Sequence, residues 1–336
     1  MTAGRDAALR AAKRLTETIA ALTARGPEPV RLDAGTVLDR SDAAPLGPPG
    51  GPVSPNGSCR LLRAADHWIA VNLPREDDAD LVPAWTGCAF GEPVWPAIEA
   101  AAMSEPADAF VARGAELGLA VARLGETRPE GRHGILVQPL SDTAPPGTHT
   151  RRVLDLSALW AGPLCAGVLA AAGHRVVKAQ STARPDPVAV SAPAHDARLN
   201  GRKQRLSLDF TREALLPLVA EADVIVTSAR PRAFAALGLM PESLFATNPR
   251  LIWIAVTAHG WTGPGAMRTG FGDDAAVAGG LVDWRDGKPV FAGDALADPL
   301  TGLAAAAAAL EAIERGTGAF IDAALARVAA SASAAA

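Results

Sequence analysis

Asp298 lies in the segment ALADPLTGL, directly before a proline and an alanine-rich run. Because proline is well tolerated at the first position of a helix, the pattern predicts a helix that begins at Pro299. The dipole of that helix favours a negative charge at its start, so we expect Asp298 to be ionised at neutral pH. An ionised carboxylate can attack an electrophilic carbonyl. The same position is also typical of an ordinary helix cap, and the local pattern leaves both roles open.

Further polar groups that could take part in chemistry lie beside glycines. Asp273 and Asp274 are adjacent in GFGDD, although paired aspartates near glycine more often mark a turn or a helix start. His259, in AHGWTGP, has no carboxylate close to it in sequence, so a structural or exposed histidine is the simpler interpretation. The three cysteines are widely spaced, with no CxxC pair or histidine cluster, which argues against a metal site.

The composition is that of a globular protein whose partners are small molecules or proteins. Its 336 residues favour two domains, and a formal net charge of −4 argues against binding to nucleic acid. Residues 1–25 carry charges at helical spacing, which predicts an amphipathic helix rather than a signal peptide. The apolar run LAAAAAALEAI near residue 303 is too short to span a bilayer. We therefore expect a soluble cytoplasmic protein that does not bind membranes.

Two regions must position these side chains. Residues 26–56 are rich in proline and glycine and predict a linker or loop. The following segment CRLLRAADHWIAVNLP predicts one or two strands, and EPVWPAIEAAAM and PADAFVARGAELG predict helices. Together, residues 26–150 predict a small α+β domain that ends at the interruption SDTAPPGTHT.

Residues 151–330 alternate between continuously apolar strand segments and helical segments. This pattern is typical of a parallel sheet with helices on both faces, and it predicts a Rossmann-like α/β domain. No GxGxxG follows the first strand segment, so we expect no dinucleotide cofactor.

Eight segments, in one order over roughly residues 152 to 325, resemble the family III CoA transferases. This family includes formyl-CoA and carnitine CoA transferases and the α-methylacyl-CoA racemases. The segments are VLDLSALWAGP, GHRVVKAQ, NGRKQRLSLDF, EADVIVTSARPRAFAALGL, NPRLIWIAVTAHGWTGPG, GFGDDAAVAGGL, ADPLTGLAAAAAALEAI and GTGAFIDAALA. The resemblance implies transfer of CoA from an acyl-CoA to a carboxylic acid, with Asp298 as the nucleophile that becomes an aspartyl-CoA thioester. It also implies a homodimer with interlocked chains and no permanently bound cofactor.

The resemblance also implies a CoA-binding groove, because phosphates require fixed cations and backbone donors. The matching residues are Ala161, Lys178, Arg202, Lys203, Arg205 and Arg230. Each of the five cations among them, taken alone, is also typical of a solvated surface charge.

The region before residue 150 resembles the family's small domain, which in the family normally follows the large one. Gly50 and Gly51 would then belong to a mobile loop that shields the intermediate, although their proline-rich setting also suits a linker. The chain would be a permuted or half-length version of the family.

The racemases of this family have GHD where this chain has GFGDD. Phe271 stands at the histidine position and cannot carry a proton, which weakens the racemase interpretation. Asp273 or Asp274 could substitute after a small backbone shift. His259 could line the site. Two alternatives to CoA transfer stay open: a non-catalytic acyl-CoA-binding or partner subunit, and an acyl-CoA racemase or isomerase.

Overall fold

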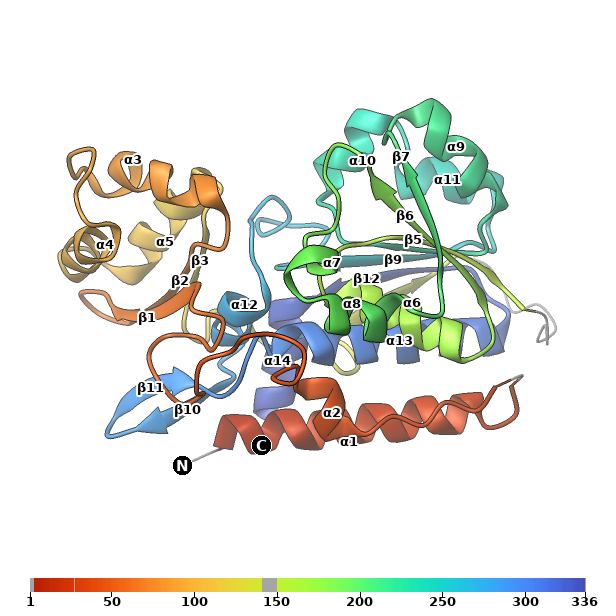
Figure 1. The fold of residues 1–336 in the computed structure, drawn as a ribbon, viewed down its shortest axis with the longest axis horizontal. Coiled ribbons are helices and arrows are strands. Elements are labelled where there is room, and N and C mark those ends of the chain that lie inside the picture. Colours follow the sequence, from red (N-terminus) through yellow and green to blue (C-terminus); the bar gives the residue numbers. More distant parts are fainter. Residues whose placement is uncertain (1–2, 27, 141–149, 336) are drawn as a thin grey trace.

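The computed structural model describes residues 3–26, 28–140 and 150–335. Its main feature is a seven-stranded sheet with helices on both faces, beside a smaller unit of three strands and helices (Figure 1). The predicted fold class, a largely parallel α/β sheet with an additional α+β unit, is confirmed. The interruption SDTAPPGTHT, where we expected the domain boundary, lies almost wholly outside the described residues.

The large sheet has a single antiparallel strand at one edge, and its other strands are parallel. In their order across the sheet, the strands are β4 (Ile135–Pro139), β12 (Ala319–Ala324), β9 (Ile252–Thr257), β8 (Val224–Thr227), β5 (Arg152–Leu156), β6 (Arg175–Ser181) and β7 (Gln204–Leu208). From β7 to β12 the parallel strands follow the order 3-2-1-4-5-6 of doubly wound folds. The strand order therefore reverses between β5 and β8, and a crevice is expected at the carboxyl ends of these two strands.

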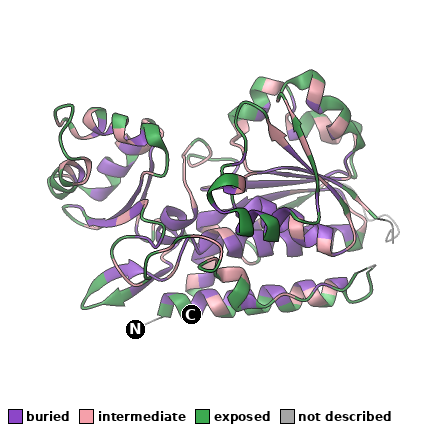
Figure 2. Ribbon diagram, in the orientation of Figure 1, coloured by how far each residue is buried: buried purple, intermediate pink, exposed green. Residues whose placement is uncertain are grey.

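Helices cover both faces of this sheet because its strands are apolar on both sides. The lower face in Figure 1 carries α6 (Ala161–Ala171), α13 (Ala297–Arg315) and α14 (Leu325–Ala334). The opposite face carries α9 (Arg212–Glu221), α10 (Pro231–Leu237) and α11 (Pro241–Thr247). Figure 2 shows α13 almost entirely buried, as expected for a helix that is apolar on all sides.

The first helix, α1 (Ala3–Thr23), agrees with the predicted amphipathic helix. Its buried side chains, including Leu15 and Ile19, belong to the same core as α6 and α13 (Figures 1 and 2). Over the described residues, no helix combines the length and the apolar character that a bilayer crossing requires. The apolar face of α1 packs against α13 and covers it.

The smaller unit has its own core around Trp85 and Phe110. Its elements are β1 (Cys59–Arg63), β2 (Trp68–Asn72), the 3-10 helix η1 (Glu76–Leu81), α3 (Val82–Thr86), α4 (Val94–Met103), α5 (Ala107–Glu116) and β3 (Ala120–Arg123). The three strands form an antiparallel sheet in the order β1-β2-β3. This unit contains most of the elements expected between residues 26 and 150.

Some segments join the two regions. Helix α12 (Gly272–Ala278) packs against β2 and β3, although it follows the large-sheet strand β9 in sequence. The hairpin of β10 (Val282–Arg285) and β11 (Lys288–Phe291) shares a buried cluster with β1. Conversely, β4 comes from the region before residue 150 and pairs with β12 in the large sheet. Segments from each half of the chain are therefore built into the other half.

Candidate active site

A cavity of about 400 Å³ lies at the strand-order reversal of the large sheet. Its walls include Ala161 at the start of α6, Arg230 after β8, Phe271 before α12 and Asp298 at the start of α13. A second cavity of about 700 Å³ adjoins it and extends towards the smaller unit. In open α/β sheets this crevice is the usual ligand site, so the fold brings Asp298 to the expected place.

The helix that carries Asp298 begins earlier than predicted. Helix α13 starts at Ala297 and Leu296 caps it, so Pro299 occupies the third helical position instead of the first. Asp298 is therefore in the first turn, and its backbone N–H donates to the carbonyl of Ala295 at 2.9 Å. The interpretation of Asp298 as the residue that caps the helix is wrong, because a further turn of backbone precedes it.

Gly272 packs directly against the carboxylate of Asp298. A Cβ atom at position 272 would overlap Oδ2 of Asp298 and would also meet Ala295. Glycine is required here because no side chain fits between the starts of helices α12 and α13. Although Asp298 packs closely against Gly272, the residue keeps some solvent exposure and borders the cavity.

The charges of three other aspartates, Asp273, Asp274 and Asp294, act on Asp298. Asp273 accepts a hydrogen bond from the backbone N–H of Ala295 at 2.8 Å, and its other oxygen accepts one from Asn56. Asn56 also donates to Asp294 at 3.1 Å. We call Asp273, Asp274, Asp294 and Asp298 the carboxylate cluster.

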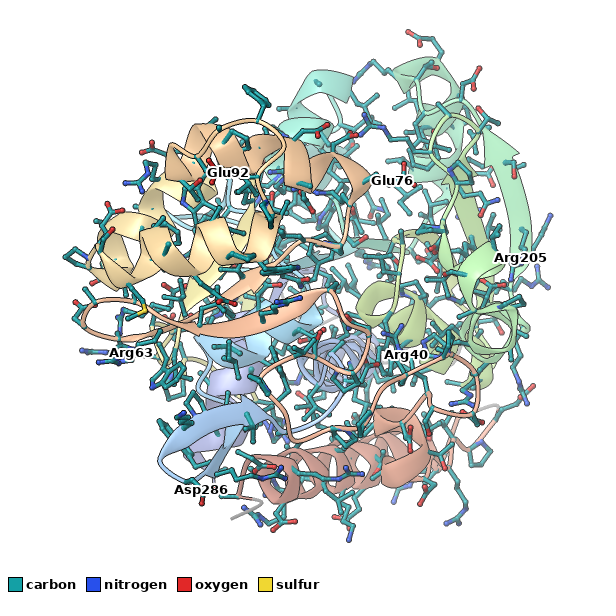
Figure 3. The ribbon with its side chains drawn as sticks, turned by 60° about the vertical axis from the view of Figure 1, so that its left-hand side comes forward. Arg40, Arg63, Glu76, Glu92, Arg205 and Asp286 are labelled. Atoms are coloured by element: carbon teal, nitrogen blue, oxygen red, sulfur yellow. The ribbon has the colours of Figure 1, made fainter. Side chains whose placement is uncertain are left out.

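Arg40 is the cation paired with this cluster. Its Nε lies 2.6 Å from Oδ2 of Asp294, and its guanidinium stacks on the ring of Trp160 at 4.8 Å from the centroid. Arg40 lies near the centre of the view in Figure 3, in the loop that follows α2 (Ala34–Leu38). The segment predicted to be a linker therefore supplies both Arg40 and Asn56 to the surroundings of Asp298.

Burial raises the pKa of Asp298 to about 8; the charge of Arg40 opposes this shift, while Asp273 and Asp294 add to it. Burial and Asp294 likewise raise the pKa of Asp273 to about 7. A pKa of about 8 runs against the expectation that Asp298 is ionised at neutral pH, because loss of water and the neighbouring carboxylates both favour the protonated form.

Asp274 and His259 each have an unpaired side-chain atom close to Gly270. Oδ1 of Asp274 accepts hydrogen bonds from Asn72 and from the N–H of Phe271, whereas its Oδ2 has no partner among the described residues. The Nε2 atom of His259 also lacks one there. A Cβ at Gly270 would lie 2.7 Å from the former atom and 3.3 Å from the latter. Burial lowers the pKa of His259 to about 3, so this imidazole is neutral.

Two non-glycine residues near the cavity have left-handed backbones. Leu159 (φ 67°) borders the cavity and donates its N–H to the carboxylate of Asp186, which pairs with the buried Lys178 at 3.2 Å. Ala295 (φ 45°) is held by Asp273. Such strained residues persist only where their surroundings hold them, and they concentrate at functional sites.

Four of the six residues expected to bind CoA are engaged elsewhere. Lys178 is buried in its pair with Asp186, and Lys203 is buried against Asp155 at 2.8 Å. The other two are Arg202, which pairs with Glu28, and Arg205, which pairs with Asp196 on the outer edge of the sheet (Figure 3). Only Ala161 and Arg230 line the cavity.

Three arginines that the sequence interpretation missed line the cavity instead: Arg75, Arg184 and Arg232. The side chains of Arg184 and Arg232 line the cavity without an ion pair or hydrogen bond to any other side chain in the described part of the chain. The segments ARPDP and ARPR carry a shared signal, because an arginine beside a proline follows the end of a parallel strand in each. Arg75 comes from the smaller unit, and nothing in its local sequence marks it.

The predicted glycine loop is pinned in place. The N–H of Gly50 donates to the carbonyl of Phe291 at 3.0 Å, and the N–H of Phe291 donates to Gly51 at 2.9 Å. Both glycines thus extend the hairpin β10–β11, and they do not line the cavity. The shielding role expected for them has no support in this arrangement.

The fold and the crevice define an open α/β protein with a ligand site at its strand-order reversal. The family model for CoA-transferase family III matches residues 149–336, and the chain belongs to this family. The recognition made from eight sequence segments is confirmed.

Individual relatives match about half of the chain. An acyl-CoA transferase from Fusarium pseudograminearum is 32% identical over 52% of this chain and 44% of its own length. The succinyl-CoA–D-citramalate CoA-transferase of Chloroflexus aurantiacus is 33% identical over 49% of this chain and 44% of its own. A solved CAIB/BAIF family protein from Brucella suis is 32% identical, with a TM-score of 0.50, over 54% of this chain and 53% of that one. The chain thus spans about half the length of the relatives it matches.

Proposed function

We propose that this protein transfers CoA from an acyl-CoA to a carboxylic acid through a covalent intermediate on Asp298. The observation that carries this proposal is the position of Asp298, which lies in the matched family segment and opens onto the crevice cavity. The relatives named as CoA-transferases support the same reaction class.

The chemistry begins when an oxygen of ionised Asp298 attacks the thioester carbonyl and expels the CoA thiolate, leaving a mixed anhydride. The thiolate then attacks the aspartyl carbonyl and releases the first carboxylic acid as its carboxylate, so that CoA is held as an aspartyl thioester. An incoming carboxylate repeats these two steps in reverse. Each cycle restores the Asp298 carboxylate, and no external oxidant or proton donor is consumed.

The cavity offers cations of the kind that CoA requires. Arg184, Arg230 and Arg232 lie after β6 and β8 and line the same cavity as Asp298. Guanidinium groups bind phosphate oxygens in bidentate geometry, so we assign them to the nucleotide end of CoA. Lys178 acts indirectly in this proposal, since its partner Asp186 holds the strained turn at Leu159.

We further propose that the N-terminal region plays the part of the family's small domain. It supplies Arg40, Asn56 and Asn72 to the carboxylate cluster, although it lies outside the segment that the family model matches. Association into a homodimer remains a proposal that rests on the family alone, and light scattering after size-exclusion chromatography tests it.

The covalent step can be tested by trapping. The protein is incubated with succinyl-CoA or another acyl-CoA and then with hydroxylamine, which converts an acylated carboxyl into a hydroxamate. Peptide mass spectrometry should locate this change on Asp298 and should find none in Asp298→Asn. An unmodified Asp298 peptide during measured CoA transfer would refute the aspartyl intermediate.

A non-catalytic acyl-CoA-binding subunit is the second candidate, favoured by the raised pKa of Asp298. It predicts CoA binding in calorimetry without turnover of any acyl-CoA and acid pair. A racemase or isomerase has less support, because Phe271 borders the cavity where a proton-carrying side chain would be needed. Deuterium uptake into an acyl-CoA from solvent would support the racemase or isomerase function.

A further inference from the structure

A separate cavity of about 430 Å³ lies outside the carboxylate cluster and the crevice. It is enclosed between the N-terminal segment around α2 and helices α6 and α8 (Pro193–Asn200). Its size falls within the range of small-molecule sites. Aliphatic side chains form a large part of its wall, including Val37, Leu164 and Val168.

His195 lies in the wall of this cavity with both ring nitrogens buried and without a hydrogen-bond partner among the described residues. The residue is only 1% exposed. A buried polar group usually has a partner, because leaving it unpaired costs about 1–3 kcal/mol. Its ring meets Trp160 edge-on, with centroids 4.8 Å apart, and that contact satisfies neither nitrogen. A ligand in the cavity would supply the missing partner.

The rim of the cavity is basic. Arg31, Arg198 and Arg202 all line it. Arg31 makes no ion pair within the described residues. Arg198 and Arg202 pair with exposed carboxylates, Asp42 and Glu28, and Arg198 also donates to the carbonyl of Asp39 at 3.0 Å. Exposed pairs of this kind contribute little, so the guanidiniums can be shared with an anion. Asp33 also lines the rim, but its carboxylate accepts two hydrogen bonds from Thr36.

We propose that this cavity is a second ligand site, for an amphipathic carboxylate whose apolar body fills the aliphatic wall and whose carboxylate meets His195 and the arginine rim. Burial, together with the charges of Arg40 and Arg198, lowers the pKa of His195 to about 4, so at neutral pH its ring offers one N–H donor. The apolar wall excludes small hydrophilic acids, because they would leave it unfilled.

Trp160, which lines this cavity, connects it with the carboxylate cluster. The indole of Trp160 contacts His195 and also carries the guanidinium of Arg40, which pairs with Asp294. A ligand beside His195 therefore lies one side chain away from the cation of the carboxylate cluster. The inference concerns binding and stands independently of the proposed CoA transfer.

The test is calorimetric titration of the full chain at pH 7 with octanoate and with octylammonium, which has the same chain length and the opposite charge. We expect saturable binding of one octanoate per chain and no binding of octylammonium. Equal binding of both compounds, or absence of octanoate binding, would overturn the proposal.

Two variants locate the site. Ala171→Phe places a ring in the cavity from α6, and Val37→Phe does so from α2. Each should weaken octanoate binding at least tenfold, whereas Ala235→Phe, at an exposed position on α10, should not. Circular dichroism identifies any variant that fails to fold, and the other variant then decides. Octanoate affinity equal to wild type in a folded cavity variant would disprove the location. CoA titrations of the same variants should be unchanged, which separates this inference from the proposed function.

Discussion

Burial raises the pKa of Asp298 to about 8, which favours its protonated form at neutral pH. Only the carboxylate form can attack a thioester. We therefore expect kcat/KM for CoA transfer to increase about tenfold per pH unit from pH 6 and to level off near pH 8, since this quantity follows ionisation in the free enzyme. A pH–rate series with one acyl-CoA checks this. A flat profile below pH 7 would show that the carboxylate is already ionised.

The same pKa affects stability. Because the folded pKa of Asp298 lies above the value of an unfolded aspartate, the folded state holds a proton that the unfolded chain releases. This contribution is full below about pH 4 and is lost as pH rises through about 8. Thermal melts from pH 5 to 8 should show a smaller decrease in Tm for Asp298→Asn than for wild type. The exposed Asp80→Asn serves as control and should follow wild type.

Arg40 is the cation that lowers the pKa of Asp298, against the effect of burial. Arg40→Gln should therefore move the rising limb of the pH–rate profile to higher pH, and Arg40→Lys should largely restore it. Arg113→Gln removes an ion pair with Glu105 in the smaller unit and provides the control. An unchanged limb in Arg40→Gln would show that this arginine has no influence on the nucleophile.

At the scale of elements, the neighbouring residues Arg202 and Lys203, which precede β7, make different kinds of contact. Lys203 is fully buried and donates to Asp155, Pro163 and Asn200, which ties β7 to β5 and α6. Arg202 makes an exposed pair with Glu28.

Replacement of these two residues should therefore have very different costs. Lys203→Met leaves a buried carboxylate unpaired and should lower the free energy of unfolding by about 3–5 kcal/mol, whereas Arg202→Gln should change it by about 1 kcal/mol or less. Urea denaturation measures both. Equal losses would contradict the assignment of Lys203 to a structural role.

The elements themselves were largely predictable. The alternation of continuously apolar strands with helical segments predicted the parallel sheet, because that pattern depends on burial of both faces. The start of α13 was missed by two residues, since Ala297 and Asp298 carry no signal that separates a cap from a first turn.

At the scale of the molecule, α1 covers the apolar helix α13 and so joins the first residues to the core of the last ones. Ile19 is completely buried in this contact, while Glu17 is exposed. Ile19→Ala should cost about 2–5 kcal/mol of unfolding free energy, and Glu17→Ala should cost little.

The transition of Ile19→Ala should also remain single, with circular dichroism and tryptophan fluorescence coincident, because α1 and the large sheet share one core. Loss of α1 signal at lower denaturant than the sheet would instead show that the helix is an independent attachment.

The sequence alone determined the family, the parallel sheet and the candidate nucleophile Asp298, because each depends on local pattern or on segments that follow one another along the chain. Only the tertiary structure decided which cations face Asp298 and whether it holds a proton. Lys178 and Lys203 looked like ligand contacts and are buried in ion pairs, while Arg40 and Asn56, in a predicted linker, reach the carboxylate cluster. The physical reason is that desolvation and charge pairing depend on which side chains meet in space, and no local pattern records such contacts; Arg40 and Asn56 reach aspartates more than two hundred residues away in sequence.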